Sequence, residues 1–278
     1  MPLLTRNIEF LPPVKLSPWR KVAMGTWRTV GDPSVYGIVE MDVAPALEYM
    51  KKIESKTGSK ITLTHFVGKV IANTMAKHPE INCVQRWGRL YPRKNVDIFF
   101  QVATDNSGKD LSGLTIRNTD KKSLLEIALE MQAMVQKIRS EGDPDFRKMK
   151  NLMGLIPGWA SRYLLNISSF LLLGLNVWSP LMGTPRDPFG GCMVTSIGTL
   201  GLDIAFAPLV PYSKVPLLLA VGLAKDTPIA KNGQVVITKI SKICATFDHR
   251  LIDGVHAGKM LKTMTAIFEN PERELGPV

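Results

Sequence analysis

The stretch that decides the fold lies near the C-terminus and reads Phe247-Asp248-His249-Arg250-Leu251-Ile252-Asp253-Gly254. The segment before it, residues 235–247, is rich in Val, Ile and Thr, which favour β-strands. The segment after it has apolar residues at steps of three and four, which predicts an amphipathic helix. These residues are Ala257, Met260, Leu261, Met264, Ile267 and Phe268. The polar stretch is therefore expected on a tight connection from a strand to a helix.

His249 and Asp253 are the residues of this connection with the clearest chemistry. A histidine held there is well placed for proton transfer, because imidazole titrates near neutral pH. Asp253 lies where the helix would begin, so it could cap the helix, orient the imidazole of His249 or hold a partner arginine. The alternative is that His249 is an ordinary polar loop residue and that Asp253 is only a cap.

The pattern Asp-His-Arg-x-x-Asp-Gly, after a strand and before a helix, resembles the signature of the 2-oxo acid dehydrogenase acyltransferases. These are dihydrolipoamide acyltransferase cores, related to chloramphenicol acetyltransferase. Further segments resemble the same family and keep its order along the chain. They are residues 15–23, 79–82, 114–124, 190–201 and 215–223.

Composition and charge limit the classes of partner. The chain has 278 residues, of which 45% are hydrophobic, enough for one large domain or two modest ones. Its net charge of +11 favours anionic partners such as a phosphorylated cofactor or an anionic membrane. The positive charge is spread out and no nucleic-acid-binding signature is present, so no nucleic acid is expected. The N-terminus lacks the long apolar core of a secretory signal, which indicates a cytoplasmic location.

The three cysteines, Cys83, Cys192 and Cys244, lie far apart in the sequence and each has apolar neighbours. This spacing predicts reduced, buried thiols, and neither a disulfide framework nor a metal site.

Residues 142–189 form an insert where the family has a short loop. We expect two short helices there, at about 146–155 and 159–173. The apolar run 164–178 is shorter than the roughly 20 residues of a spanning helix and is interrupted by polar residues. The insert could be a packing or oligomer-contact hairpin, a hairpin that binds a membrane surface or an acyl chain, or, least in keeping with its length, a spanning helix.

The resemblance implies a chloramphenicol acetyltransferase-like two-layer α/β sandwich, with a mixed β-sheet, flanking helices and the apolar helical insert. Residues 1–278 would be a single acyltransferase catalytic domain, with no lipoyl or subunit-binding domain, so any lipoyl group would be supplied in trans. By the same resemblance the chain would form a homotrimer with active sites at the subunit interfaces, and the family also builds such trimers into larger cores.

The resemblance also implies an activity, in which an acyl group moves between coenzyme A and a thiol acceptor such as dihydrolipoamide. His249 would be the base that deprotonates the thiol. Thr195 stands at the position of the family's oxyanion-stabilising serine, and Ser196 beside it is a second candidate. No metal takes part, and the residues that bind coenzyme A are not identified.

Four further residues would support this site by resemblance. Asp253 would act structurally and electrostatically, with Arg20 as its partner, and Asp248 and Arg250 would shape the loop. Two other functions remain open: a stand-alone acyltransferase for a longer-chain or membrane-associated acyl substrate, and a non-catalytic assembly or scaffold protein with the same fold.

Overall fold

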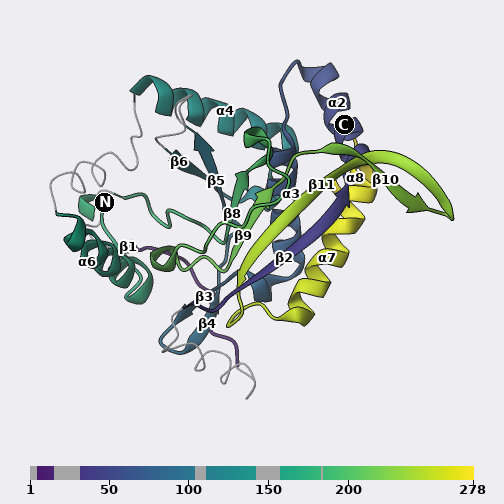
Figure 1. The fold of residues 1–278 in the computed structure, drawn as a ribbon. Coiled ribbons are helices and arrows are strands. Elements are labelled where there is room, and N and C mark those ends of the chain that lie inside the picture. The colour runs from purple at the N-terminus through teal and green to yellow at the C-terminus, as the bar shows by residue number, and fades with distance from the viewer. Residues whose placement is uncertain (1–4, 16–31, 104–110, 142–156, 183) are drawn as a thin grey trace.

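The computed structural model describes residues 5–15, 32–103, 111–141, 157–182 and 184–278. Runs of strands are separated by pairs of helices along the chain (Figure 1). The strands are β1 (Thr5–Arg6), β2 (Ser34–Asp42), β3 (Cys83–Arg86), β4 (Arg89–Pro92), β5 (Ile98–Ala103), β6 (Leu111–Ile116), β7 (Val177–Trp178), β8 (Cys192–Ser196), β9 (Leu217–Val221), β10 (Lys225–Lys231) and β11 (Gln234–Asp248). The helices are α2 (Ala44–Thr57), α3 (Leu63–Lys77), α4 (Leu124–Glu141), α6 (Gly158–Ser169), α7 (Gly254–Glu269) and α8 (Pro271–Leu275).

One seven-stranded sheet organises the molecule. Its order is β10-β11-β9-β8-β5-β6. The seventh strand, β2, lies outside this order and also pairs with β11. The central pairs β5–β8 and β8–β9 are parallel, and the remaining pairs are antiparallel. The predicted mixed sheet is therefore confirmed. The turn at Asn232-Gly233 joins β10 to β11 in an antiparallel hairpin.

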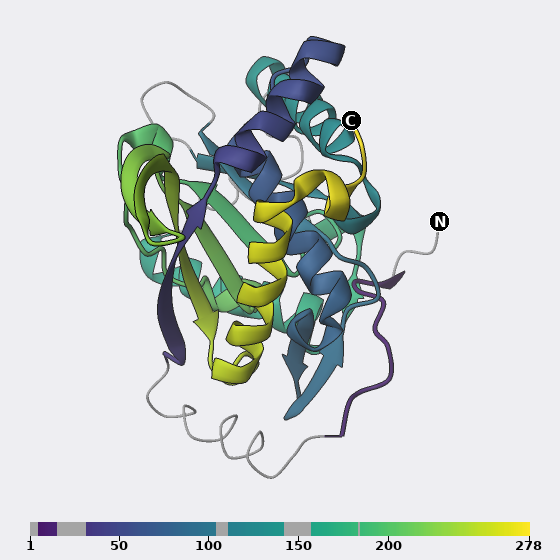
Figure 2. The same cartoon turned by 90° about the vertical axis from the view of Figure 1, so that its right-hand side faces the viewer.

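Helices α3 and α7 cover one face of this sheet and lie side by side (Figure 2). Both begin with a side-chain cap. Thr62 and His65 form a reciprocal capping box at α3, and Asp253 caps α7. The helix expected after Asp253 is thus present.

The two faces of the sheet carry different apolar clusters. Along β8, Cys192 and Val194 belong to the large core beneath the helices, whereas Met193 belongs to a smaller cluster on the opposite face. Side chains alternate along a strand, so Thr195 and Ser196 point to opposite faces. Thr195 lies on the face that α3 and α7 leave open, and Ser196 lies on the helical face.

The insert packs against distant parts of the chain. Helix α6 continues into a π-helical turn at Phe170–Gly174, and β7 pairs antiparallel with β1. Trp87, between β3 and β4, donates from Nε1 to the carbonyl of Gly174 at 2.9 Å and contacts the ring of Phe170 edge-to-face. The helix expected at 159–173 is therefore confirmed in α6 and its π-helical end, whereas the helix expected at 146–155 lies outside the described residues.

None of the helices in the described part of the chain is long and apolar enough to cross a membrane. The three cysteines are all buried, as expected.

Candidate active site

The connection that carries His249 is held by main-chain hydrogen bonds on both sides. The amide of Asp248 donates to the carbonyl of Pro216 at 2.9 Å, and the amide of His249 donates to the carbonyl of Pro33 at 3.0 Å. The amide of Ile252 donates back to the carbonyl of Asp248 at 2.9 Å. Leu251 and Ile252, two and three residues after His249, are buried. The backbone around His249 is therefore fixed between the end of β11 and the start of α7.

Asp248 and Arg250 form an ion pair across this connection. The guanidinium of Arg250 donates to the carboxylate from Nε at 2.9 Å and from Nη2 at 2.6 Å, and the amide of Arg250 donates to Oδ1 at 3.0 Å. Asp248 is buried, so water screens this pair poorly. These contacts join two residues of the loop to each other, and their role in shaping it stays a prediction.

Asp253 caps α7 and contacts a histidine that the sequence reasoning did not single out. Its Oδ1 accepts from the amide of His256 at 3.1 Å and lies 2.6 Å from Nδ1 of the same residue. Of the three roles considered for Asp253, the structure shows the helix cap. The spacing Asp-x-x-His, three residues apart at a helix start, follows the logic of a capping box and could have predicted this contact.

Thr195 and His249 lie at different positions along the strand direction of the sheet. Thr195 pairs with Ala220 of β9, and Ala220 pairs with Cys244 of β11. His249 comes five residues after Cys244, which corresponds to roughly 16 Å along the strand direction. One chain therefore does not bring the two side chains together.

Next to the connection lies a pocket of about 420 Å³. Asp248, Arg250 and Lys214 line it, and burial lowers the pKa of Lys214, with further lowering by the positive charges of Arg86 and Arg250. Lys214 has a left-handed backbone (φ 49°), which turns the chain just before β9. No sequence pattern indicated that Lys214 lies in this pocket, because the residues that surround it in space are far apart along the chain.

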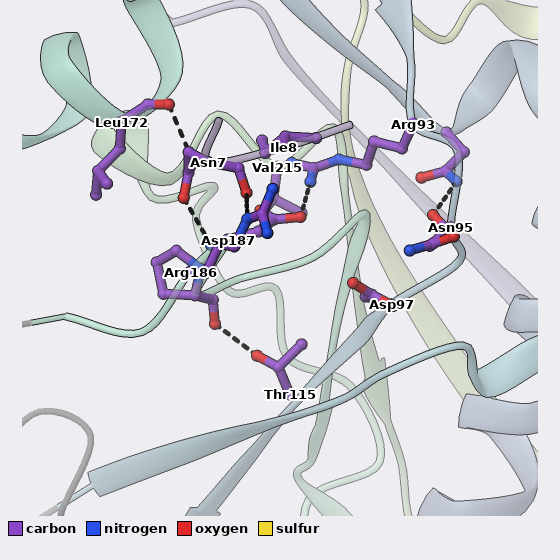
Figure 3. Close-up of polar contacts among 12 residues, drawn as sticks. Asn7, Ile8, Arg93, Asn95, Asp97, Thr115, Leu172, Arg186, Asp187 and Val215 are labelled. Carbon is purple, nitrogen blue, oxygen red and sulfur yellow. Dashed lines mark hydrogen bonds and ion pairs between the residues drawn. The ribbon is translucent and has the colours of Figure 1, made fainter. Parts of the chain in front are cut away.

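A second polar cluster fixes the C-terminal end of the insert (Figure 3). Buried Arg93 makes an ion pair with Asp187, and Asn7 accepts from the amide of Asp187 at 2.8 Å. Asn7 also donates to the carbonyl of Leu172 at 3.0 Å, and Arg117 donates to the carbonyl of Asp187 at 2.8 Å. The cluster ties the N-terminal strand, the main sheet and the insert to one another.

Arg20, the expected partner of Asp253, lies outside the described residues. Within the residues that the structure does describe, no group of three or more His, Cys, Asp or Glu side chains is arranged to hold a metal ion.

The comparison with protein families decides the relationship. The model of the 2-oxoacid dehydrogenases acyltransferase (catalytic domain) matches residues 14–143 and 185–275. The chain belongs to this family. Both segments together cover most of the sequence, and the residues between them, 144–184, fall within the insert.

Members of the family are also found among curated proteins and solved structures. The chain is 26% identical over 218 residues to the dihydrolipoyllysine-residue acetyltransferase component of the acetoin cleaving system of Bacillus subtilis, covering 78% of this chain and 44% of that protein. The chain thus spans about half the length of the curated relatives it matches.

Two solved structures show the fold. The dihydrolipoamide acetyltransferase of Azotobacter vinelandii superposes with a TM-score of 0.64 at 20% identity, covering 95% of this chain and 100% of that one. A chloramphenicol acetyltransferase superposes with a TM-score of 0.53 at 15% identity, covering 92% and 99%. The predicted chloramphenicol acetyltransferase-like fold is therefore confirmed.

Proposed function

We propose that this protein is a coenzyme A-dependent acyltransferase that moves an acyl group between coenzyme A and a thiol acceptor such as dihydrolipoamide. The observation that carries the proposal is His249, held on the connection between β11 and α7 by main-chain hydrogen bonds and flanked by the Asp248–Arg250 pair. Family membership supports it, because the related protein of Bacillus subtilis is named as a dihydrolipoyllysine-residue acetyltransferase.

In the proposed mechanism, the imidazole of His249 takes the proton of the attacking thiol. The thiolate adds to the carbonyl carbon of the thioester and forms a tetrahedral intermediate with an oxyanion. The hydroxyl of Thr195 donates a hydrogen bond to that oxyanion. When the intermediate collapses, the carbon–sulfur bond to the leaving thiolate breaks, and protonated His249 returns its proton to that sulfur. The acyl group has then moved between two thiols with no net change in protons.

The solved structure from Azotobacter vinelandii supports the choice of His249 and Asp253. A serine, a histidine and an asparagine are described as having a role in the catalytic mechanism of that enzyme, and the histidine and asparagine are four positions apart. His249 and Asp253 have the same spacing. Asparagine and aspartate both cap helices well, so a cap at this position fits either residue.

We further propose that the active site is shared between copies of the chain in a homotrimer. One argument is the separation of Thr195 from His249 within one chain. Another is an exposed apolar patch on the open face of the sheet. Ile38 pairs with Cys244, which belongs to the cluster on that face, and Tyr36 contacts Phe206 edge-to-face.

This patch is suited to a contact with a second copy. Its members are all at least a third exposed, namely Tyr36, Ile38, Leu202, Ile204 and Phe206. An apolar patch of this kind on a single chain is typical of a protein–protein contact. In such an assembly His249 of one chain faces Thr195 of its neighbour, and a larger core of several trimers stays a prediction.

One observation on the insert supports a second, additional role. Tyr163, Ile167 and Phe170 are 63%, 57% and 48% exposed, at helical spacing on α6 and its π-helical end. An exposed apolar stripe on a helix fits an interfacial contact with a membrane or with another protein.

The test is acyl transfer from a panel of acyl-coenzyme A donors to free dihydrolipoamide, with the wild type and His249→Ala. Loss of the general base should lower the rate by about 100- to 10,000-fold. Equal rates in both proteins would mean that His249 is not the base. No transfer by the wild type, together with no binding of coenzyme A, would favour the scaffold function.

A further inference from the structure

An apolar pocket of about 210 Å³ lies between the sheet and α7. Figure 2 shows how α7 lies over this face of the sheet. Strands β2, β9 and β11 form one wall, and α7 forms the other. Among its lining residues, Gly37 is paired with Ala245 in the strand register, and Gly258 faces them from α7. The lining side chains are hydrocarbon or thioether groups or are missing altogether, so the pocket suits an apolar ligand.

Small residues on both walls keep the pocket open. A Cβ atom at Gly258 would meet no atom within 4 Å, and a Cβ at Gly37 would meet only the ring of Phe247 at 3.9 Å. Neither glycine needs a left-handed backbone. Glycine weakens the middle of a helix or a strand, and neither steric crowding nor backbone conformation requires it at these two positions. Space in the pocket is a physical reason for both.

The pocket ends at the connection that carries His249. Phe247, two residues before His249, and Ile252, three residues after it, both line the pocket. The connection from β11 to α7 therefore lies at one end of the pocket. A group that reacts beside His249 can place an apolar tail between the strand and the helix.

We propose that this pocket holds the acyl chain of the thioester substrate and that the protein therefore transfers acyl groups longer than acetyl. This inference rests on the proposed function, because it assigns the pocket to the substrate of that same site. The bound chain would displace water from an apolar surface, so affinity increases with each methylene group until the pocket is full.

The experiment measures binding and turnover for saturated acyl-coenzyme A donors from acetyl to octanoyl. Binding is measured by calorimetry with the full chain, and turnover by transfer to dihydrolipoamide. Two variants fill the pocket from opposite walls, Gly37→Val and Gly258→Leu. Ala230→Val, on exposed strand β10, adds apolar volume away from the pocket and serves as the control.

In the wild type and the control, octanoyl-coenzyme A should bind more tightly than acetyl-coenzyme A. Both filling variants should reduce that preference by about 10-fold or more and leave acetyl-coenzyme A nearly unaffected, as expected when methylene groups lose their space. A folded Gly258→Leu protein keeps the test valid if Gly37→Val does not fold.

Two results would overturn the pocket assignment. One is acyl-coenzyme A binding in the wild type that is absent or independent of chain length. The other is a chain-length preference that both filling variants retain. Length-dependent binding without any turnover would support the pocket and count against the acyltransferase. Turnover of acetyl groups, together with binding that does not depend on chain length, would support the acyltransferase and count against the pocket.

Discussion

Oδ1 of Asp253 lies 2.6 Å from Nδ1 of His256 and accepts a hydrogen bond from the amide of the same residue. Asp253 thus begins α7 and holds the first turn of the helix against the connection that carries His249. A carboxylate at a helix N-terminus also interacts favourably with the helix dipole. Its first effect is on the geometry of the connection, and its effect on catalysis would follow from that geometry.

Asp253→Ala should lower the free energy of unfolding by about 1 kcal/mol, because the cap is lost. Asp253→Asn should lose little stability, because the amide oxygen still accepts from the amide of His256. Chemical denaturation of the three proteins measures the difference. Equal stability of the alanine variant and the wild type would show that the cap is not needed.

Activity measurements on variants can distinguish the roles of Thr195 and Ser196. Thr195→Val removes the hydroxyl at nearly constant shape and should lower kcat by about 100- to 1,000-fold. Thr195→Ser keeps the hydroxyl and should retain most of the activity. Ser196→Ala should have less effect than Thr195→Val, because Ser196 points to the helical face of the sheet. A larger loss for Ser196→Ala would reverse the assignment.

Because of the buried His65, the free energy of unfolding is expected to decrease in mild acid. Burial lowers its pKa to about 4, and its Nδ1 accepts from the amide of Thr62, which requires the neutral ring. Because the folded pKa lies below the unfolded pKa of 6.5, the unfolded chain takes up the proton first as pH falls. Stability should therefore decrease between about pH 6.5 and pH 4, by an amount on the order of 2 kcal/mol.

His65→Gln provides the control for this effect. Glutamine at the third helical position can complete the capping box without a titrating group. The variant should show a flatter stability curve between pH 6.5 and pH 4, measured by denaturation at several pH values. An unchanged curve would assign the acid sensitivity to other groups.

The exposed stripe on α6 can be tested with lipid vesicles. If the insert contacts a membrane surface, the wild type should sediment with anionic vesicles, since the chain carries a net charge of +11. Tyr163→Ser combined with Ile167→Ser should weaken this binding several-fold. Val235→Ser combined with Ile237→Ser, on exposed positions of β11, is the matched control. Equal sedimentation of both double variants would exclude the stripe as the contact.

The local part of the fold could be predicted from the sequence. The high content of Val, Ile and Thr in residues 235–247 and the three- and four-residue steps after Asp253 are local signals, and both elements formed as expected. The position of β1 beside β7 joins residues more than 170 positions apart. No local pattern carries that pairing, because it depends on where the insert packs.

The site could be predicted in part. His249 and Asp253 stand in one short motif, so their placement on a strand-to-helix connection followed directly. The apolar pocket could not be predicted, because Gly37 and Gly258 acquire their meaning only when β2 and α7 face each other. The same holds for Lys214, whose charged neighbours come from separate segments.

The most direct test of the central claim is to mix two inactive proteins. His249→Ala and Thr195→Val chains are expressed together, and the purified mixed oligomers are assayed for acyl transfer. If each site takes His249 from one chain and Thr195 from its neighbour, about a quarter of the sites in randomly mixed trimers are intact, and activity should recover to about that fraction. Activity no higher than that of the two separate variants would contradict a site shared between chains.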